Sequence, residues 1–200
     1  MTTFLLIRHG LNDLVDKAIA GWMPGVHLNA AGQAQAAQLA ERLAQAPIAA
    51  LYSSPLERAR ETAAPLAERL GLEIRTCEDF GEIRFGDWTG KELKELAADP
   101  HWQQFNALRS LTRAPGGETM LEVQARTVRA LEALRQQHPN EMVAVVSHGD
   151  PIKSALLYLL GLPMDFYSRF DISPASVSVV TVDEYHPRLL RLNDAGATIR

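Results

Sequence analysis

Phe4-Leu5-Leu6-Ile7-Arg8-His9-Gly10 and Met142-Val143-Ala144-Val145-Val146-Ser147-His148-Gly149 follow one pattern: an uninterrupted apolar run, one polar residue, then histidine and glycine. Short continuous apolar runs are typical of strands that are buried on both faces of a largely parallel sheet. The carboxyl ends of parallel strands lie at one edge of the sheet, where ligands bind. The two His-Gly pairs are therefore expected at that edge.

The rest of the chain alternates further strands with helices. Strands are expected at Ile48 to Tyr52 and Val177 to Val182, with an edge strand at Leu189 to Leu192. Composition and apolar spacing predict helices over Asn29 to Ala46, Ser54 to Gly71, Lys91 to Ala98, Glu118 to Gln137 and Pro151 to Leu160.

Two of these helices carry sequence signals for their first turn. Ser54 and Glu57, three residues apart, have the spacing of a capping box, and Pro55 suits a first helical position. Asp150 is expected to cap the helix that begins at Pro151. Gly71 suits the left-handed conformation that ends many helices.

Alternating strands and helices predict an α/β fold, a three-layer α/β/α sandwich with a mostly parallel central sheet. The chain has 200 residues, of which 46% are hydrophobic and 22% charged, values typical of a globular protein. One domain over residues 1–200 is expected. The stretch 77–117 has few strand signals, and we expect it to form a partly helical lid over the site.

Composition also excludes several classes of function. The formal net charge of -4 disfavours nucleic acid as a partner. No apolar stretch approaches the roughly 20 residues that span a bilayer, so no membrane contact is expected. Cys77 is the single cysteine and cannot form an internal disulfide, and the amino-terminal residues lack the features of a signal peptide, so a cytoplasmic location is the expectation.

Arg8, His9 and Gly10 together suit the binding and attack of a phosphate. A neutral imidazole that donates from one nitrogen keeps a lone pair on the other, which makes His9 a candidate nucleophile. The planar guanidinium of Arg8 holds phosphate oxygens, and Gly10 lets the backbone approach them closely. The alternative for a single histidine at a strand end is a packed residue satisfied by backbone hydrogen bonds.

Arg58 is a second candidate because it lies near the start of a predicted helix, where the helix dipole disfavours a cation. A phosphate at the helix start would offset this cost, since amides and guanidinium would converge on it. The alternative is a solvated arginine paired with Glu57 or Glu61.

His148 and Gly149 precede another predicted helix, so exposed backbone N–H groups and a positive helix end lie beside the imidazole. A phosphate there would favour the charged form of His148. Such a cation stabilises the charge that spreads over phosphoryl oxygens during transfer.

Three motifs in order resemble the histidine phosphatase (phosphoglycerate-mutase-like) superfamily over nearly the whole chain. They are Leu6-Ile7-Arg8-His9-Gly10, the stretch Ser53-Ser54-Pro55-Leu56-Glu57-Arg58-Ala59-Arg60-Glu61-Thr62, and Ser147-His148-Gly149-Asp150. The stretch from Gly81 to Gly90 lies between the second and third, and Pro115 to Thr119 resembles a loop of the short phosphatase-type members.

This resemblance implies that His9 is transiently phosphorylated and that Arg8, Arg58 and His148 form the phosphate pocket. It also implies that Glu82 is the proton donor; spacing alone leaves Glu82 among several acidic residues, namely Glu78, Asp79, Glu82 and Asp87. Departures from the family pattern lie at Leu11 and Val15, where the family has polar residues, and Ala20 replaces a common threonine.

Asn12 and Gly21 are expected to supply secondary phosphate contacts, with Gly149 near the second histidine. His9 and His148 have no third ligand at a diagnostic spacing, so neither a metal nor any other cofactor is expected. The remaining histidines, His27, His101, His138 and His186, are interpreted as surface or structural residues.

The leading hypothesis is a metal-independent phosphomonoesterase that acts on a small phosphorylated metabolite through a phosphohistidine. The enzymic alternative is a phosphoglycerate mutase or related phosphomutase. Arg109 and Arg113 are the only Lys or Arg residues between Lys94 and Arg126, which favours hydrolysis. A third alternative is a catalytically idle module that binds phosphorylated ligands or proteins. The sequence leaves the oligomeric state open, a homodimer being one option.

Overall fold

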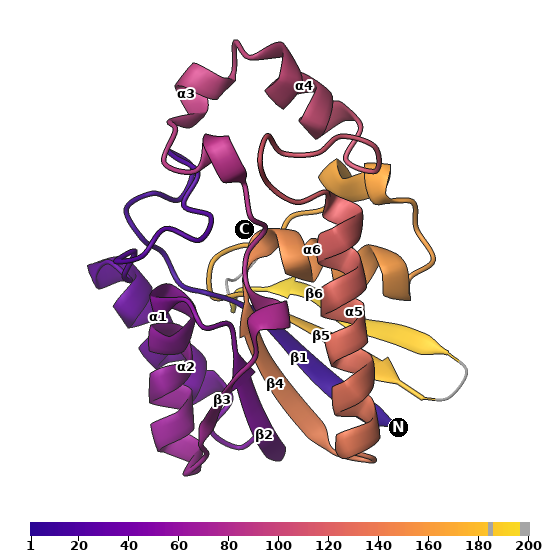
Figure 1. Ribbon diagram of the computed structural model, residues 1–200. Coiled ribbons are helices and arrows are strands. Elements are labelled where there is room, and N and C mark those ends of the chain that lie inside the picture. The colour runs from indigo at the N-terminus through magenta and orange to yellow at the C-terminus, as the bar shows by residue number, and fades with distance from the viewer. Residues whose placement is uncertain (184–185, 197–200) are drawn as a thin grey trace.

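The computed structural model describes residues 1–183 and 186–196 and contains a six-stranded sheet of order β3-β2-β4-β1-β5-β6 (Figure 1). The strands are β1 (Thr2–Arg8), β2 (Ile48–Ser53), β3 (Ile74–Thr76), β4 (Met142–Ser147), β5 (Val177–Val182) and β6 (Pro187–Asp194). The first four strands of that order pair in parallel, and β5 and β6 are antiparallel to their neighbours. The predicted mostly parallel sheet is confirmed.

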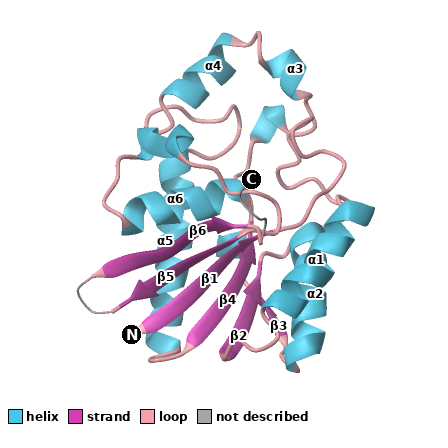
Figure 2. Ribbon diagram, turned by 180° about the vertical axis from the view of Figure 1, so that it is seen from behind, coloured by secondary structure: helices cyan, strands magenta, loops and turns pink. Residues whose placement is uncertain are grey.

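Helices cover both faces of the sheet (Figure 2). The helices α1 (Ala30–Arg42) and α2 (Glu57–Leu70) enclose one apolar core, which includes Leu39, Leu51 and Leu66. On the other face, α5 (Met120–Gln137) and α6 (Gly149–Leu159) enclose a second core. Apolar burial of this kind is the main favourable contribution to folding.

A segment between β3 and α5 rises above the carboxyl edge of the sheet (Figure 1). It contains two short 3-10 turns, η1 (Glu78–Phe80) and η2 (Gly86–Trp88), and two helices, α3 (Leu93–Leu96) and α4 (Pro100–Ala107). Trp88 and Phe105 pack edge to face within a third apolar core, with ring centroids 5.3 Å apart. A further 3-10 segment, η3 (Met164–Arg169), follows α6.

Helix boundaries differ from the sequence-based expectation in several places. The expected helix over Lys91 to Ala98 is only the four residues of α3, and neither α4 nor β3 was predicted. The α5 helix begins after Thr119, whose side chain accepts a hydrogen bond from the Glu122 N–H. Among the described residues, no helix combines the length and apolar character needed to cross a membrane.

Both predicted caps were wrong. The α2 helix begins at Glu57, and its carboxylate accepts a hydrogen bond from the Gly25 N–H instead of closing a capping box. Ser54 hydrogen-bonds to the His148 ring, 2.8 Å away. Asp150 lies inside the first turn of α6, because the extended backbone that precedes the helix is at His148. Both side chains have tertiary partners instead, the His148 ring for Ser54 and the Arg109 guanidinium for Asp150.

The loop after β1 lies directly on α1, and glycine makes this approach possible. A Cβ built on Gly32 would lie 2.0 Å from the Leu11 carbonyl oxygen, and one on Gly10 would lie 2.8 Å from the Gly32 carbonyl oxygen. Backbone atoms at these distances cannot move aside individually. The close contact therefore fixes the position of the loop that follows His9.

We predict that Gly32→Ala lowers the free energy of unfolding by about 1–3 kcal/mol, the usual range for overpacking. Helix propensity alone predicts the opposite sign, a gain of about 1 kcal/mol. Urea unfolding followed by circular dichroism measures the difference, with Ala34→Ser on the exposed side of α1 as the control. A stabilised Gly32→Ala protein would contradict the proposed contact.

Candidate active site

The His9 and His148 imidazoles lie beside each other at the carboxyl edge of the sheet, with ring centroids 5.0 Å apart. Their closeness follows from topology, because β1 and β4 are parallel neighbours and Arg8 is in register with Ser147. His9 is 4% exposed and lines a cavity, whereas His148 is fully buried behind it. The two histidines predicted from the repeated pattern are thus brought together.

His9 is held in one orientation. Its Nδ1 lies 2.7 Å from the Gly10 carbonyl oxygen, which can only accept, so Nδ1 carries the hydrogen and Nε2 keeps its lone pair. Burial, followed by the charges of Arg58 and Arg8, lowers the pKa of His9 well below its ordinary value. A neutral imidazole that keeps its lone pair on Nε2 is the form that attacks phosphorus.

Arg58 lies against His9 and is 1% exposed. Its Nε donates to the His9 Nε2 over 3.4 Å, and its Nη2 donates to the Gly21 carbonyl oxygen over 2.9 Å. Its Nη1 is buried and has no hydrogen-bond partner in the described part of the chain. Glu57 and Glu61, the partners expected of a solvated arginine, instead contact Gly25 N and His27.

Two more buried nitrogens at this site have no partner among the described residues, the Arg8 Nε and the His148 Nδ1. The Arg8 Nη1 donates to the Ile172 carbonyl oxygen over 2.6 Å. Ser54 Oγ accepts from the Leu56 N–H and lies 2.8 Å from the His148 Nε2. In the tautomer in which Ser54 donates to Nε2, the His148 Nδ1 carries a hydrogen with no acceptor among the described residues. Buried donors without partners are rare, and here they suit an anion.

Glu82 lies on the same cavity as His9 and Arg58. Burial, with a smaller contribution from the charge of Asp150, raises the pKa of the Glu82 carboxyl to about 8. One of its oxygens accepts a hydrogen bond from the Ile83 N–H over 3.0 Å. The other acidic candidates, Glu78, Asp79 and Asp87, do not line this cavity. Glu78 instead pairs with Arg84 in solvent.

The backbone around Glu82 is held by Arg126 of α5. This guanidinium donates to the carbonyl oxygens of Asp79, Gly81 and Glu82 at 2.7, 2.8 and 2.9 Å, and it pairs with the Glu118 carboxylate at 3.0 Å. The indole N–H of Trp22 donates to the same Glu82 carbonyl oxygen. Arg126 thus fixes a loop that has no regular secondary structure of its own.

The cavity has a volume of about 170 Å³ and adjoins a second one of about 440 Å³. Four residues line both of them: Arg8, Asp16, Glu82 and Asp150. A ligand held at His9 therefore has room to extend past Glu82.

The secondary residues expected from the sequence have different positions. Asn12 lines the small cavity, but its Oδ1 accepts from the N–H groups of Leu14 and Val15 and so holds the loop. Gly21 also lines it and orients Arg58 through its carbonyl oxygen. Gly149 lines the larger cavity.

Sequence reasoning missed three residues that support the site. Ser54 contacts His148, Thr62 accepts from the Gly10 N–H over 2.9 Å, and Arg126 holds the Glu82 loop. Ser54 directly follows β2 at the same sheet edge, and this position could have indicated that it belongs to the site. Thr62 and Arg126 contact backbone groups distant in sequence, which no local pattern reveals.

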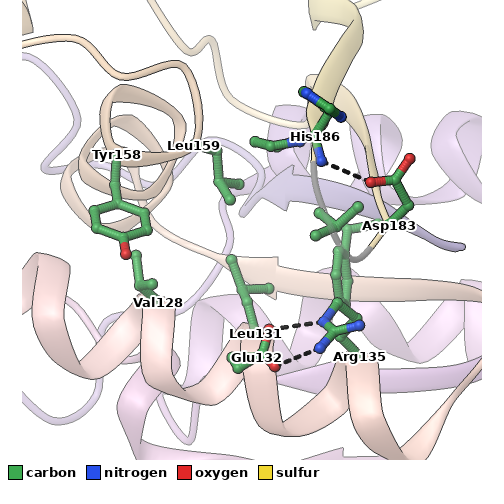
Figure 3. Close-up of a pocket in the computed structure, with 11 residues that line it drawn as sticks. Val128, Leu131, Glu132, Arg135, Tyr158, Leu159, Asp183 and His186 are labelled. Atoms are coloured by element: carbon green, nitrogen blue, oxygen red, sulfur yellow. Dashed lines mark hydrogen bonds and ion pairs between the residues drawn. The ribbon is translucent and has the colours of Figure 1, made fainter.

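A further hollow, of about 390 Å³, lies at the other end of β1, between α5, α6 and the end of β5 (Figure 3). Glu132 and Arg135 form an ion pair on its wall, and Leu131 and Leu159 supply apolar surface. No group of acidic, histidine or cysteine residues in the described part of the chain is arranged to hold a metal ion.

An α/β sheet with two imidazoles and two guanidinium groups around a cavity at its carboxyl edge defines a class of phosphate-handling proteins. The family comparison agrees with this class. Residues 4–195 match the model of the histidine phosphatase superfamily (branch 1), and the chain belongs to that family.

Similar proteins include phosphatases. Phosphoserine phosphatase 1 of Hydrogenobacter thermophilus is 29% identical over 96% of this chain and 92% of its own. The structure of Bacillus stearothermophilus YhfR has a TM-score of 0.91 at 30% identity and covers 97% of this chain and 98% of its own. That of a mycobacterial glucosyl-3-phosphoglycerate phosphatase complexed with VO3 has a TM-score of 0.87 at 29% identity, over 96% and 98%.

We predict that Arg58→Met weakens the binding of orthovanadate by at least about tenfold, because charged hydrogen bonds to the anion are lost. Titration calorimetry measures the affinity. Arg60→Met, an exposed position on the same helix, is the matched control and should bind as the unchanged protein does. A folded Arg58→Met protein with unchanged affinity would show that the guanidinium is not part of the anion site.

Proposed function

We propose that this protein is a metal-independent phosphomonoesterase that acts on a small phosphorylated metabolite through a phosphohistidine at His9. The observation that carries this proposal is the lone pair of the His9 Nε2 beside the buried guanidinium of Arg58, which has a donor without a partner. A phosphoryl group placed there would meet a nucleophile and a set of donors at once.

In the first step, the His9 Nε2 attacks phosphorus while the bond between phosphorus and the ester oxygen breaks. Arg8, Arg58 and His148 donate to the phosphoryl oxygens, and Asn12 and Gly149 lie close enough to the cavities to add contacts. Gly21 acts through Arg58. Preorganised donors of this kind stabilise the transition state without reorganisation at the moment of reaction.

Glu82 supplies the proton that the departing oxygen needs. With a pKa of about 8, its carboxyl is largely protonated at neutral pH. After the transfer the resulting carboxylate removes a proton from water, and the water oxygen attacks the phosphorus bound to His9. The bond between phosphorus and nitrogen breaks, inorganic phosphate leaves, and Glu82 is protonated again.

The surroundings of Arg109 and Arg113, the two arginines between Lys94 and Arg126, favour hydrolysis over a mutase reaction. Arg109 is buried and contacts Asp150, and Arg113 pairs with Glu122. Neither lines the cavity at His9 or the one beside it. The similar proteins described above include phosphatases by name, which supports the same choice.

We also propose that residues 1–200 act as one domain, in which the segment 77–117 serves as the lid of the site. Glu82 belongs to this segment and Arg109 lies at its end. The Arg109 guanidinium reaches Asp150 of α6 over 3.1 Å and so ties the segment to the helix behind the site.

The decisive experiment is turnover of p-nitrophenyl phosphate in the presence of EDTA, together with trapping of the phosphoenzyme by acid quench. We predict that the protein hydrolyses this ester and that His9→Ala abolishes both turnover and phosphoenzyme. His27→Ala, an exposed histidine, is the control. Phosphoglycerate interconversion without hydrolysis would instead identify a mutase, and inactivity in both assays a binding module.

Glu82→Gln should lower kcat/KM by about 100-fold to 10,000-fold on alkyl phosphates, the usual contribution of a general acid. Aryl phosphates need less proton assistance and should lose less. In the unchanged protein, kcat/KM for an alkyl phosphate should fall as pH rises through about 8, because the Glu82 proton is lost there.

This alkaline decline should be absent from Glu82→Gln, since an amide does not titrate. Glu78→Gln, four residues away and exposed, is the control and should keep the decline. Equal losses on alkyl and aryl esters, or a decline that persists in Glu82→Gln, would remove Glu82 from the role of proton donor.

A further inference from the structure

The larger cavity beside His9 has room for the part of the substrate that is attached to the phosphoryl group. Its volume is about 440 Å³, and it shares Arg8, Asp16, Glu82 and Asp150 with the cavity at His9. Glu82, the proposed proton donor, lies where the two meet. The departing alcohol of a substrate held at His9 would therefore lie in the larger cavity.

Lys153 is a buried cation on the wall of this cavity. It lies near the start of α6 and is 8% exposed. Its ammonium group has three hydrogens to donate, and the described residues offer it one acceptor, the Asp171 Oδ1 at 3.4 Å. The Asp171 side chain is 90% exposed and so is a weak, water-screened partner.

Two aromatic rings lie near the ammonium group of Lys153. The faces of these rings offer it no oxygen or nitrogen acceptor. The Lys153 Nζ lies 4.4 Å from the centroid of the Tyr167 ring and 5.8 Å from that of Phe170. Burial lowers the pKa of Lys153, and this effect outweighs the opposing one of the exposed Asp171 carboxylate. The site is thus a desolvated cation with unused donors.

The neighbouring charges limit what such a site can bind. Asp150 is already engaged by Arg109 and by the Tyr167 hydroxyl. Asp16 and Asp171 add negative charge to the same cavity. Arg8 also lines this cavity, but it is assigned to the phosphoryl group at His9. A second phosphate dianion would therefore add two negative charges beside the Lys153 ammonium, whereas a carboxylate adds one.

We propose that Lys153 is a specificity-determining residue that binds a carboxylate on the non-phosphorylated part of the substrate. The substrate class is then a phosphorylated hydroxy acid, with its phosphate at His9 and its carboxylate at Lys153. This inference rests on the proposed phosphomonoesterase function and adds to it the identity of the second recognised group.

The experiment compares phosphate esters that differ in a carboxylate. The pairs are O-phosphoserine with O-phosphoethanolamine, 3-phosphoglycerate with glycerol 3-phosphate, and 3-carboxyphenyl phosphate with phenyl phosphate. For at least one pair, kcat/KM should favour the carboxylated ester by about tenfold or more, the usual effect of a charged hydrogen bond. Lys153→Met should reduce that ratio to near one, and Lys153→Arg should keep more of it.

Each ratio is taken within a single preparation, so a partly unfolded variant does not change it. Met also keeps an unbranched stem against Tyr167. Lys94→Met is the control, since this lysine has a side chain that is 78% exposed. No turnover of any ester would overturn the proposed function and this inference with it. Turnover without a carboxylate preference, or a preference that Lys153→Met retains, would overturn only the role of Lys153.

Discussion

The charge of the Arg58 guanidinium is buried beside His9 without an ion pair in the described part of the chain. A buried charge without a partner is costly, and a fold tolerates it where a ligand supplies the counter-charge. Burial lowers the pKa of Arg58, and the nearby positive charges of Arg58 and Arg8 help to lower those of both histidines. Burial and these positive charges keep His9 neutral, and an anion bound at the site would supply the missing counter-charge.

The topology of the sheet makes this arrangement possible. β4 lies between β1 and β2, so the ends of these three parallel strands deliver His9, His148 and Ser54 to one edge. Parallel strands need long crossovers, and the one between β2 and β3 contains α2. The α6 helix follows β4, so the first turns of both helices lie at that edge. Arg58 thus reaches His9 from a helix start, where an anion would also be favoured by the helix dipole.

Much of this could be predicted from the sequence because its signals are local. The apolar runs before His9 and His148 indicated β1 and β4, and their polar ends indicated the site. The predicted caps at Ser54 and Asp150 were wrong because each side chain has a tertiary partner, His148 for one and Arg109 for the other. Local propensity does not contain such partners.

Arg126 is a second case in which local sequence signals do not reveal a tertiary contact. Its guanidinium contacts three carbonyl oxygens of a loop more than forty residues away, and nothing in the α5 sequence marks it as different from a surface arginine. Yet the position of Glu82 depends on this contact, since the loop has only short 3-10 turns. A rigid helix thereby holds Glu82 in a fixed position. The proposed role of Glu82 needs such precision, because a general acid acts only within hydrogen-bond reach of the departing oxygen.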